Sequence, residues 1–311
     1  MNPLLKVNFS GVRGSIAVND GTYNRYGGST SSVQLIFDNA AEIILDGGSG
    51  IYRIGQKYMS RGPAGIPENL LILISHQHWD HIQGLPFFVP MYIPKKKITI
   101  CGCNQGSQLF KDILSGQMRD PYFPVEIQNW MADIDYRSIG ETSFDFCDIN
   151  IASINAEHPG MTLGFRITYK NKSIVYMPDN ELFAKFSAEK VYTKYQGNLD
   201  NETDMSLIIL EEQKKKFFGF IEKADLFIHD SQYTRDEYKT KIGWGHSCFE
   251  DAVNAGIYAD VGHIVLFHHD PSHNDNKIDE MLSRALEIRD SLNSYCEITA
   301  ASQSSEIELY E

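Results

Sequence analysis

The chain is poor in the features that mark secreted, membrane-bound and disulfide-stabilised proteins. Its 311 residues include five cysteines, an odd number with no Cys-x-x-Cys pair. This pattern favours a reducing compartment over a disulfide framework. No stretch reaches the length of about 18 apolar residues that a membrane helix needs. The N-terminus also lacks the apolar run of a signal peptide. We therefore expect a cytoplasmic protein with no membrane partner.

Positive charge is also scarce. Lysine and arginine total 28 residues against 41 aspartates and glutamates, which gives a formal net charge of −13. A long nucleic-acid footprint needs a basic surface that neutralises phosphates. We therefore expect a small-molecule substrate and no extended nucleic-acid partner. The chain has no low-complexity tract, and 42% of its residues are hydrophobic, so it has the composition of a protein that folds around a core.

Short strands alternate with helices along the whole chain. Segments rich in β-branched and aromatic residues predict strands at 4–10, 33–37, 42–46, 70–75, 97–101, 144–154, 163–169, 173–177, 225–229 and 263–267. Helices are predicted at 104–116, 205–222, 248–259 and 277–293. No linker divides the chain. We predict one α/β domain over 1–311, an α+β four-layer sandwich of two sheets between helices, with a helical insertion at about 181–223.

A cluster of polar residues follows one apolar strand without a turn. The segment "NLLILIS" (69–75) runs directly into "HQHWDH" (76–81). His76 and His78 are two residues apart and can point to one side of an extended backbone. Asp80 and His81 follow at once. Imidazole and carboxylate groups are ligands for zinc, manganese or iron, so this segment predicts a metal site.

Further candidate ligands stand just beyond other predicted strands. His158 lies in "AEHPG", Asp179 ends "SIVYMPDN", and His268 lies in "HIVLFHHD", where His269 remains an alternative. Strand ends carry the ligand-binding loops of α/β proteins. Together with the histidine cluster, these residues predict a centre with two divalent metal ions.

The segment "HQHWDH" matches the H-x-H-x-D-H signature of the metallo-β-lactamase superfamily. The segment "ILDGGSG" (44–50) resembles the strand end that precedes this signature and places Asp46 near the metals. The resemblance implies an αββα sandwich with two metal ions, zinc in the first instance and manganese or iron as alternatives. It implies one ion held by His76, His78 and His158, a second held by Asp80, His81 and His268, and Asp179 bridging both.

Three segments indicate which branch of the superfamily the chain resembles. β-Lactamases of this fold lack a bridging aspartate, so Asp179 favours hydrolases of phosphodiesters or thioesters. The segments "HPGMTLGFRI" (158–167) and "GWGHS" (243–247) resemble the branch of RNase Z and the cyclic-nucleotide and cyclic-phosphate phosphodiesterases. This resemblance implies that His246 is a catalytic proton donor, that Asp230 in "FIHDSQYTRDEY" is its acidic partner, and that Asp80 is essential for turnover. Relatives in this branch are often dimers, so a homodimer is expected.

The chemistry of phosphodiesters supports these roles. Two metal ions neutralise the phosphate oxygens and supply a bridging hydroxide at neutral pH, and a histidine near pKa 6.5 can protonate the leaving oxygen. The 21 residues from His158 to Asp179 leave no room for the substrate arm that RNase Z carries there. We therefore predict a small phosphodiester substrate, such as a cyclic nucleotide or a ribose cyclic phosphate.

Two alternatives remain. A thioesterase or lactonase on the same two-metal scaffold would not need His246, because a thiolate leaves without a proton. A metal-dependent sensor or nucleic-acid binder without catalysis would retain nucleic acid in a salt-sensitive way.

Overall fold

A computed structural model describes residues 2–62, 65–182 and 201–311. Its first sheet has seven strands in the order β14-β1-β2-β3-β4-β5-β6. The strands are β1 (Leu5–Gly11), β2 (Ser32–Phe37), β3 (Glu42–Leu45), β4 (Leu70–Leu73), β5 (Lys97–Gly102), β6 (Asp133–Ser138) and β14 (Glu306–Leu309). Strands β3 to β6 are parallel. All four residues of β4, Leu-Leu-Ile-Leu, are buried, as expected for a central strand covered on both faces.

The second sheet has the order β13-β12-β11-β10-β9-β8-β7. Its strands are β7 (Ser143–Phe146), β8 (Ile149–Asn155), β9 (Leu163–Tyr169), β10 (Lys172–Met177), β11 (Leu226–Asp230), β12 (His263–Phe267) and β13 (Glu297–Ala300). Strands β10 to β13 are parallel. β8 runs in the same direction as β10, since both are antiparallel to β9.

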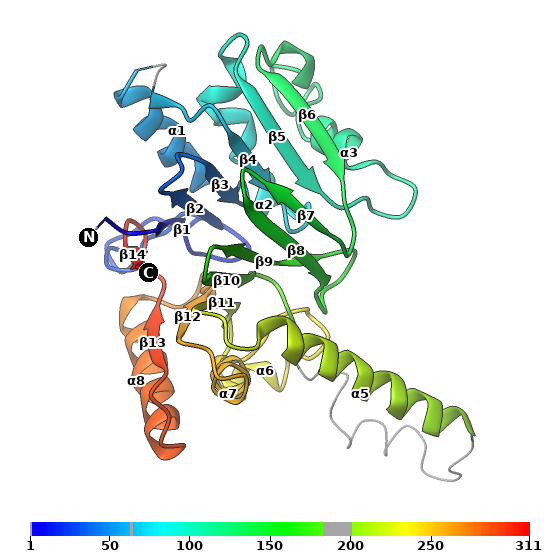
Figure 1. The fold of residues 1–311 in the computed structure, drawn as a ribbon, viewed down its shortest axis with the longest axis vertical. Helices are drawn as coiled ribbons and strands as arrows, with labels where there is room; N and C mark the ends of the chain where they lie inside the picture. Colours follow the sequence, from blue (N-terminus) through cyan, green and yellow to red (C-terminus); the bar gives the residue numbers. More distant parts are fainter. Residues whose placement is uncertain (1, 63–64, 183–200) are drawn as a thin grey trace.

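Helices cover the outer faces of both sheets (Figure 1). They are α1 (Ile51–Ser60), α2 (Trp79–Ile82), α3 (Phe110–Gly116), α5 (Asn201–Ile221), α6 (Arg235–Tyr238), α7 (Phe249–Tyr258) and α8 (Asp275–Ser291), with 3₁₀ turns η2 (Leu85–Phe87), η3 (Val89–Tyr92) and η4 (Ile127–Asn129). One apolar cluster lies between the two sheets. One further cluster lies between the first sheet and its helices, and another lies between the second sheet and its helices. The predicted αββα sandwich is confirmed.

The predicted elements differ from the observed ones in a few places. The strand predicted at 144–154 is a hairpin of β7 and β8, whose turn residues Cys147 and Asp148 have φ of 50° and 63°. Two positive φ values mark a tight hairpin turn, which glycine or asparagine usually signals; Cys-Asp gives no such signal. Helix α1 and strands β6, β13 and β14 were not predicted. β6 and β14 have mostly exposed or half-buried residues and lie at the edges of the first sheet.

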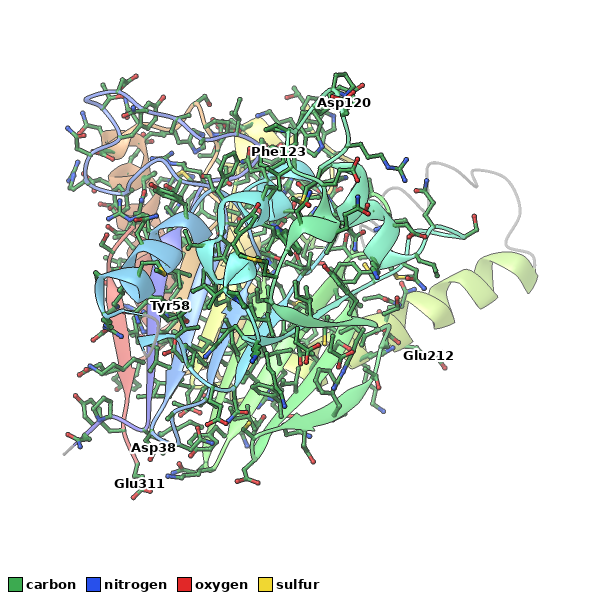
Figure 2. All side chains as sticks on the ribbon, turned by 90° about the horizontal axis from the view of Figure 1, so that it is seen from above. Asp38, Tyr58, Asp120, Phe123, Glu212 and Glu311 are labelled. Atoms are coloured by element: carbon green, nitrogen blue, oxygen red, sulfur yellow. The ribbon has the colours of Figure 1, made fainter. Side chains whose placement is uncertain are left out.

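Helix α5 accounts for the described part of the predicted insertion at 181–223. Figure 2 shows this helix, marked at Glu212, extending away from the body of the protein. Its last turns pack on the second sheet through Phe217 and Ile221. Residues 183–200 of the predicted insertion lie outside the described residues. Among the residues that the structure describes, no helix has the length and apolarity to cross a membrane.

Candidate active site

The predicted site residues come together where parallel strands end. His76 and His78 follow β4, His158 follows β8, and Asp179 follows β10. Asp230 ends β11, and His268 comes directly after β12. Because parallel strands present their carboxyl ends at one edge, residues far apart in the sequence meet there. The two sheets contribute to one centre from opposite sides.

The first group contains His76, His78, His158 and Asp179, whose potential ligand atoms all lie within 4.8 Å of one another. The Nε2 atom of His76 is 2.9 Å from Nδ1 of His78, and Nε2 of His158 is 3.1 Å from the same Nδ1. Asp179 Oδ2 lies 3.6 Å from both His76 Nε2 and His158 Nε2. Three imidazoles and a carboxylate therefore point their electron pairs at one small region.

The second group contains Asp80, His81 and His268. The Nε2 atoms of His81 and His268 are 3.3 Å apart, and Asp80 Oδ2 lies 3.3 and 3.2 Å from them. The other oxygen of Asp179, Oδ1, lies 3.0 Å from His81 Nε2 and 3.2 Å from His268 Nε2. Asp179 thus presents one oxygen to each group, which is the arrangement of a bridging ligand.

These contacts fit metal ions better than hydrogen bonds. The buried Oδ1 atom of Asp179 has no hydrogen-bond partner despite its two imidazole neighbours, and an unpaired buried carboxylate oxygen is costly. Histidines and carboxylates that crowd together in this way are a donor set for borderline divalent ions. The residues present therefore fit the metal centre that the sequence predicted.

The charge states of His76, His158 and Asp179 suit ligation. Burial lowers the pKa of the His76 imidazole well below its usual range, and burial also lowers the pKa of His158. Burial alone would raise the pKa of Asp179, but the surrounding imidazoles of His268, His81 and His76 hold this pKa well below the usual value. Neutral imidazoles and an ionised carboxylate are the ligand forms that metals require. At His81 burial lowers the pKa, but the carboxylates of Asp179, Asp80 and Asp46 outweigh it and raise this pKa well above its usual range, so a metal ion would displace a proton there.

Asp46, at the end of β3, orients His81. Its Oδ2 accepts hydrogen bonds from His81 Nδ1 at 2.8 Å, Tyr176 Oη at 2.8 Å and Ser75 Oγ at 2.9 Å, and its Oδ1 accepts one from the Ser75 backbone N–H at 2.7 Å. Asp46 is completely buried. A ligand histidine whose second nitrogen is held in this way keeps one tautomer and one ring orientation.

His246 lies beside both groups and is paired with Asp230. Its Nδ1 is 2.8 Å from Asp230 Oδ2 and 4.0 Å from Asp179 Oδ2. Its ring stacks on His268 at a centroid distance of 5.0 Å and meets His158 at 5.1 Å. Burial opposes protonation of His246, but the charge and hydrogen bond of Asp230, with Asp179 and Asp80 beyond, raise the pKa of His246 to about 9. His246 can therefore carry a proton at neutral pH.

The structure distinguishes His268 from its neighbour. His268 has φ of 60° and directs Nε2 toward Asp80, whereas Nε2 of His269 donates to the carbonyl oxygen of Ala301 at 2.9 Å. Arg13, just beyond β1, is fully buried. Its guanidinium donates to the carbonyl oxygens of Gly27, Asp270 and His273, so it braces loops and does not face the site.

Sequence reasoning missed several residues that hold the site together. Gln232 Oε1 contacts His268 Nδ1 at 3.1 Å, and the Ser15 backbone N–H donates to Asp80 Oδ2 at 2.7 Å. The buried Glu181 accepts hydrogen bonds from the loop that carries His246. Backbone donors carry no residue signature, and a single glutamine or glutamate resembles any surface residue, so the sequence held no signal for them.

The chain is similar to known proteins along most of its length. The profile described as "Beta-lactamase superfamily domain" matches residues 42–197, half of the chain. Ribonuclease Z of Sulfurisphaera tokodaii is 25% identical over 242 residues, which cover 70% of this chain and 75% of that protein. The metallo-β-lactamase fold protein YhfI of Bacillus subtilis superposes with a TM-score of 0.66 at 16% identity, covering 99% of this chain and 100% of YhfI. The short form of human tRNase Z superposes with a TM-score of 0.59 at 15% identity, covering 98% and 99% of the two chains.

The comparisons correct one prediction. We expected no extended nucleic-acid partner, but the sequence relatives include ribonuclease Z enzymes, which act on tRNA. The exclusion was wrong because the net charge of −13 is a sum over the whole surface, whereas nucleic-acid binding depends on the local field at the contact.

Three lines of observation now agree. The αββα sandwich, the histidine and aspartate groups at its strand ends and the matched family model all indicate one protein family. The chain belongs to the β-lactamase superfamily, and it is a hydrolase with the metallo-β-lactamase fold.

Proposed function

We propose that this hydrolase is a phosphodiesterase in which His246 donates a proton to the leaving oxygen. The observation that carries the proposal is the pair of His246 and Asp230, whose atoms Nδ1 and Oδ2 are 2.8 Å apart beside both ligand groups. A carboxylate partner does not by itself distinguish a proton donor from a ligand, since Asp46 holds the ligand His81 in the same way. His246 stands outside the two proposed ligand groups, so its proton is available to the leaving alkoxide, which departs poorly unless it is protonated.

Each residue has a defined task in this proposal. His76, His78 and His158 would hold one divalent ion, Asp80, His81 and His268 a second, and Asp179 would bridge them, in line with the distances between these residues. Bound there, the ions neutralise phosphate oxygens and lower the pKa of water. Asp230 accepts from Nδ1 of His246, so Nε2 carries the proton that moves to the leaving oxygen.

Two exposed tryptophans favour a substrate with a nucleobase. Trp79, between His78 and Asp80, is 77% exposed, and Trp244, two residues before His246, is 61% exposed. Each exposed indole is close to a site residue in the sequence and can stack on a base; one such stack contributes about 1–3 kcal/mol. Cyclic nucleotides and RNA ends carry such a base and a ribose cyclic phosphate does not, so comparing all three in the substrate screen tests this preference.

The test combines metal analysis with hydrolysis. We expect wild-type protein reconstituted with Zn²⁺ or Mn²⁺ to hold close to two ions per chain and to hydrolyse bis(p-nitrophenyl) phosphate. Asp179→Ala should lose metal and turnover together. His246→Gln should keep its metal and lose turnover on 2′,3′-cyclic nucleotides or on precursor tRNA.

Two results would contradict the proposal. Metal-loaded protein that cleaves thioesters or lactones but no phosphodiester would move the chain to the thioesterase or lactonase class. A His246→Gln variant with full activity on nucleotide substrates would remove the proton-donor role and leave the metal centre standing.

A further inference from the structure

Glu181 stands two residues beyond Asp179 and is 5% exposed. Its Oε1 accepts hydrogen bonds from Tyr238 Oη at 2.7 Å and from the Gly243 backbone N–H at 2.7 Å. Its Oε2 accepts one from the Gly245 backbone N–H at 2.9 Å. Two of these donors lie in the 243–246 loop, "GWGH", which carries His246 at its end, and the third, Tyr238, ends α6 five positions before the loop.

This loop contains two glycines at positive φ and packs closely against His158. Gly243 and Gly245 have φ of 89° and 88°, a region that only glycine enters readily. A Cβ on Gly245 would lie 2.3 Å from Nδ1 of His158. The carbonyl oxygen of Gly245 instead accepts a hydrogen bond from that Nδ1 at 2.8 Å. Two glycines give this loop many accessible backbone conformations, so contacts from its surroundings are needed to select this one.

The segment with Glu181 is itself anchored to the segment that leads to His158. The backbone N–H of Glu181 donates to the carbonyl oxygen of Glu157 at 2.7 Å, and Asn180 Oδ1 accepts from the backbone N–H of Glu157 at 2.9 Å. Glu157 immediately precedes His158. One short segment, 179–181, therefore connects the bridging carboxylate, the His158 turn and the 243–246 loop.

The structure assigns Glu181 as the positioning residue that fixes the 243–246 loop and so aims His246 at the leaving oxygen. This inference rests on the proposed function, because it takes His246 as the proton donor. Glu181 does not touch the reacting atoms in this arrangement. It acts through the backbone amides of Gly243 and Gly245 and through the hydroxyl of Tyr238.

The arrangement requires a carboxylate and not an amide. A carboxylate offers acceptor sites on both oxygens, whereas glutamine has one acceptor oxygen and an NH₂ group that only donates. In Glu181→Gln the NH₂ group must face the N–H of either Gly243 or Gly245, so at least one amide loses its partner. A buried donor left unpaired is costly, and we expect the loop to relax away from its tight conformation.

Two phosphodiesters with different leaving groups test this inference. p-Nitrophenolate leaves without a proton, whereas the ribose alkoxide of a 2′,3′-cyclic nucleotide needs one. With Zn²⁺ in excess, we expect Glu181→Gln to lose about 10- to 100-fold in kcat on the cyclic nucleotide, the range for a misplaced catalytic group. Its kcat on bis(p-nitrophenyl) phosphate should stay within about 3-fold of wild type, since this step does not use the donor.

Two variants frame the result. Tyr238→Phe removes one of the three donors and leaves both amides paired, so it should show the same substrate pattern with a smaller loss. Glu141→Gln is the matched control, because Glu141 lines the same cavity of about 190 Å³ as Glu181 but pairs with Asn155 and Lys216 instead. It should behave as wild type on both substrates.

Amide hydrogen exchange of residues 243–246 measures how well the loop is held in place, and it needs no substrate. Glu181→Gln should speed exchange there, and Glu141→Gln should not. Unchanged exchange, or an equal loss of kcat on both substrates, would overturn the positioning role. Wild-type protein without activity on either substrate, but with faster exchange in Glu181→Gln, would instead place the failure in the proposed function.

Discussion

Replacing Asp230 by asparagine should change the pH dependence of turnover as well as its size. The Asp230 carboxylate is completely buried and contacts His246 Nδ1 at 2.8 Å through Oδ2. Its Oδ1 accepts from the Gln232 backbone N–H at 3.0 Å. Asparagine keeps the shape and can keep the contact with Gln232. It removes the negative charge and offers Nδ1 of His246 a donor in place of an acceptor.

The magnitude follows from the protonation of His246. In the wild type the carboxylates around His246 overcome burial and raise its pKa to about 9. Without the charge of Asp230, burial brings this pKa to the ordinary value of about 6.5 or below. At pH 8 the protonated fraction falls from about nine-tenths to about three per cent, a loss of about 30-fold in active donor. Ions bound to Asp80 and Asp179 would cancel the contributions of those two carboxylates and lower the wild-type pKa, so about 30-fold is the upper limit of the loss. Asp230 is not a predicted ligand, and its own contribution remains.

The assay is kcat on a 2′,3′-cyclic nucleotide between pH 5.5 and 9.5 at saturating metal. A proton donor with a raised pKa is active below that pKa and loses activity as the pH rises through it. The basic limb of Asp230→Asn should therefore lie below that of wild type by up to about 2.5 pH units, and the ratio of the two rates should shrink toward acidic pH. A ratio that stays constant across the range would refute the reasoning and leave Asp230 a purely structural role.

Three further outcomes are expected. Dialysis against a chelator should lower the melting temperature by several degrees, because metal ions bind the folded state alone. Addition of Zn²⁺ should restore the melting temperature in wild type but not in Asp179→Ala. A wild-type melting temperature that the chelator does not change would argue against the metal site. Gly14→Ala should weaken metal binding about 10- to 100-fold, because the added Cβ would lie 2.5 Å from Cε1 of His268. Gly21→Ala is the control, since no atom lies within 4 Å of its Cβ. Equal metal affinity in both variants would contradict the prediction. Trp79→Ala should raise the KM for nucleotide substrates at least about 5-fold through loss of stacking. Tyr122→Ala, which removes an 83% exposed aromatic side chain, should leave the KM unchanged. An unchanged KM in Trp79→Ala would exclude stacking of the base on Trp79.

Much of the fold was predictable because its signals are local. The run "NLLILIS" before "HQHWDH" marks a buried central strand that ends in candidate ligands, and the structure has β4 at that place. The strand predicted at 144–154 failed because a hairpin can turn on Cys-Asp without glycine. Edge strands β6 and β14 escaped prediction because exposed or half-buried residues there break the apolar pattern.

The support of the site was not predictable in the same way. Glu181 touches the 243–246 loop across about sixty positions of sequence, and nothing in its neighbours announces the contact. The net charge led to the wrong exclusion of a nucleic-acid partner for a related reason, because it too depends on where residues lie in the fold. A sum over all residues carries no information about which of them gather at one surface.

The sequence by itself determined which side chains were available as ligands and that strands would end beside them. Periodicity and composition are properties of neighbouring residues, so they survive without a structure. Only the tertiary structure decided which way each side chain points and what surrounds it. His268 faces Asp80, while His269 turns to Ala301. The pKa of His246 rises to about 9 because carboxylates from three separate segments converge on it. Directions and fields of this kind arise from contacts between distant segments, and these exist only once the two sheets have packed.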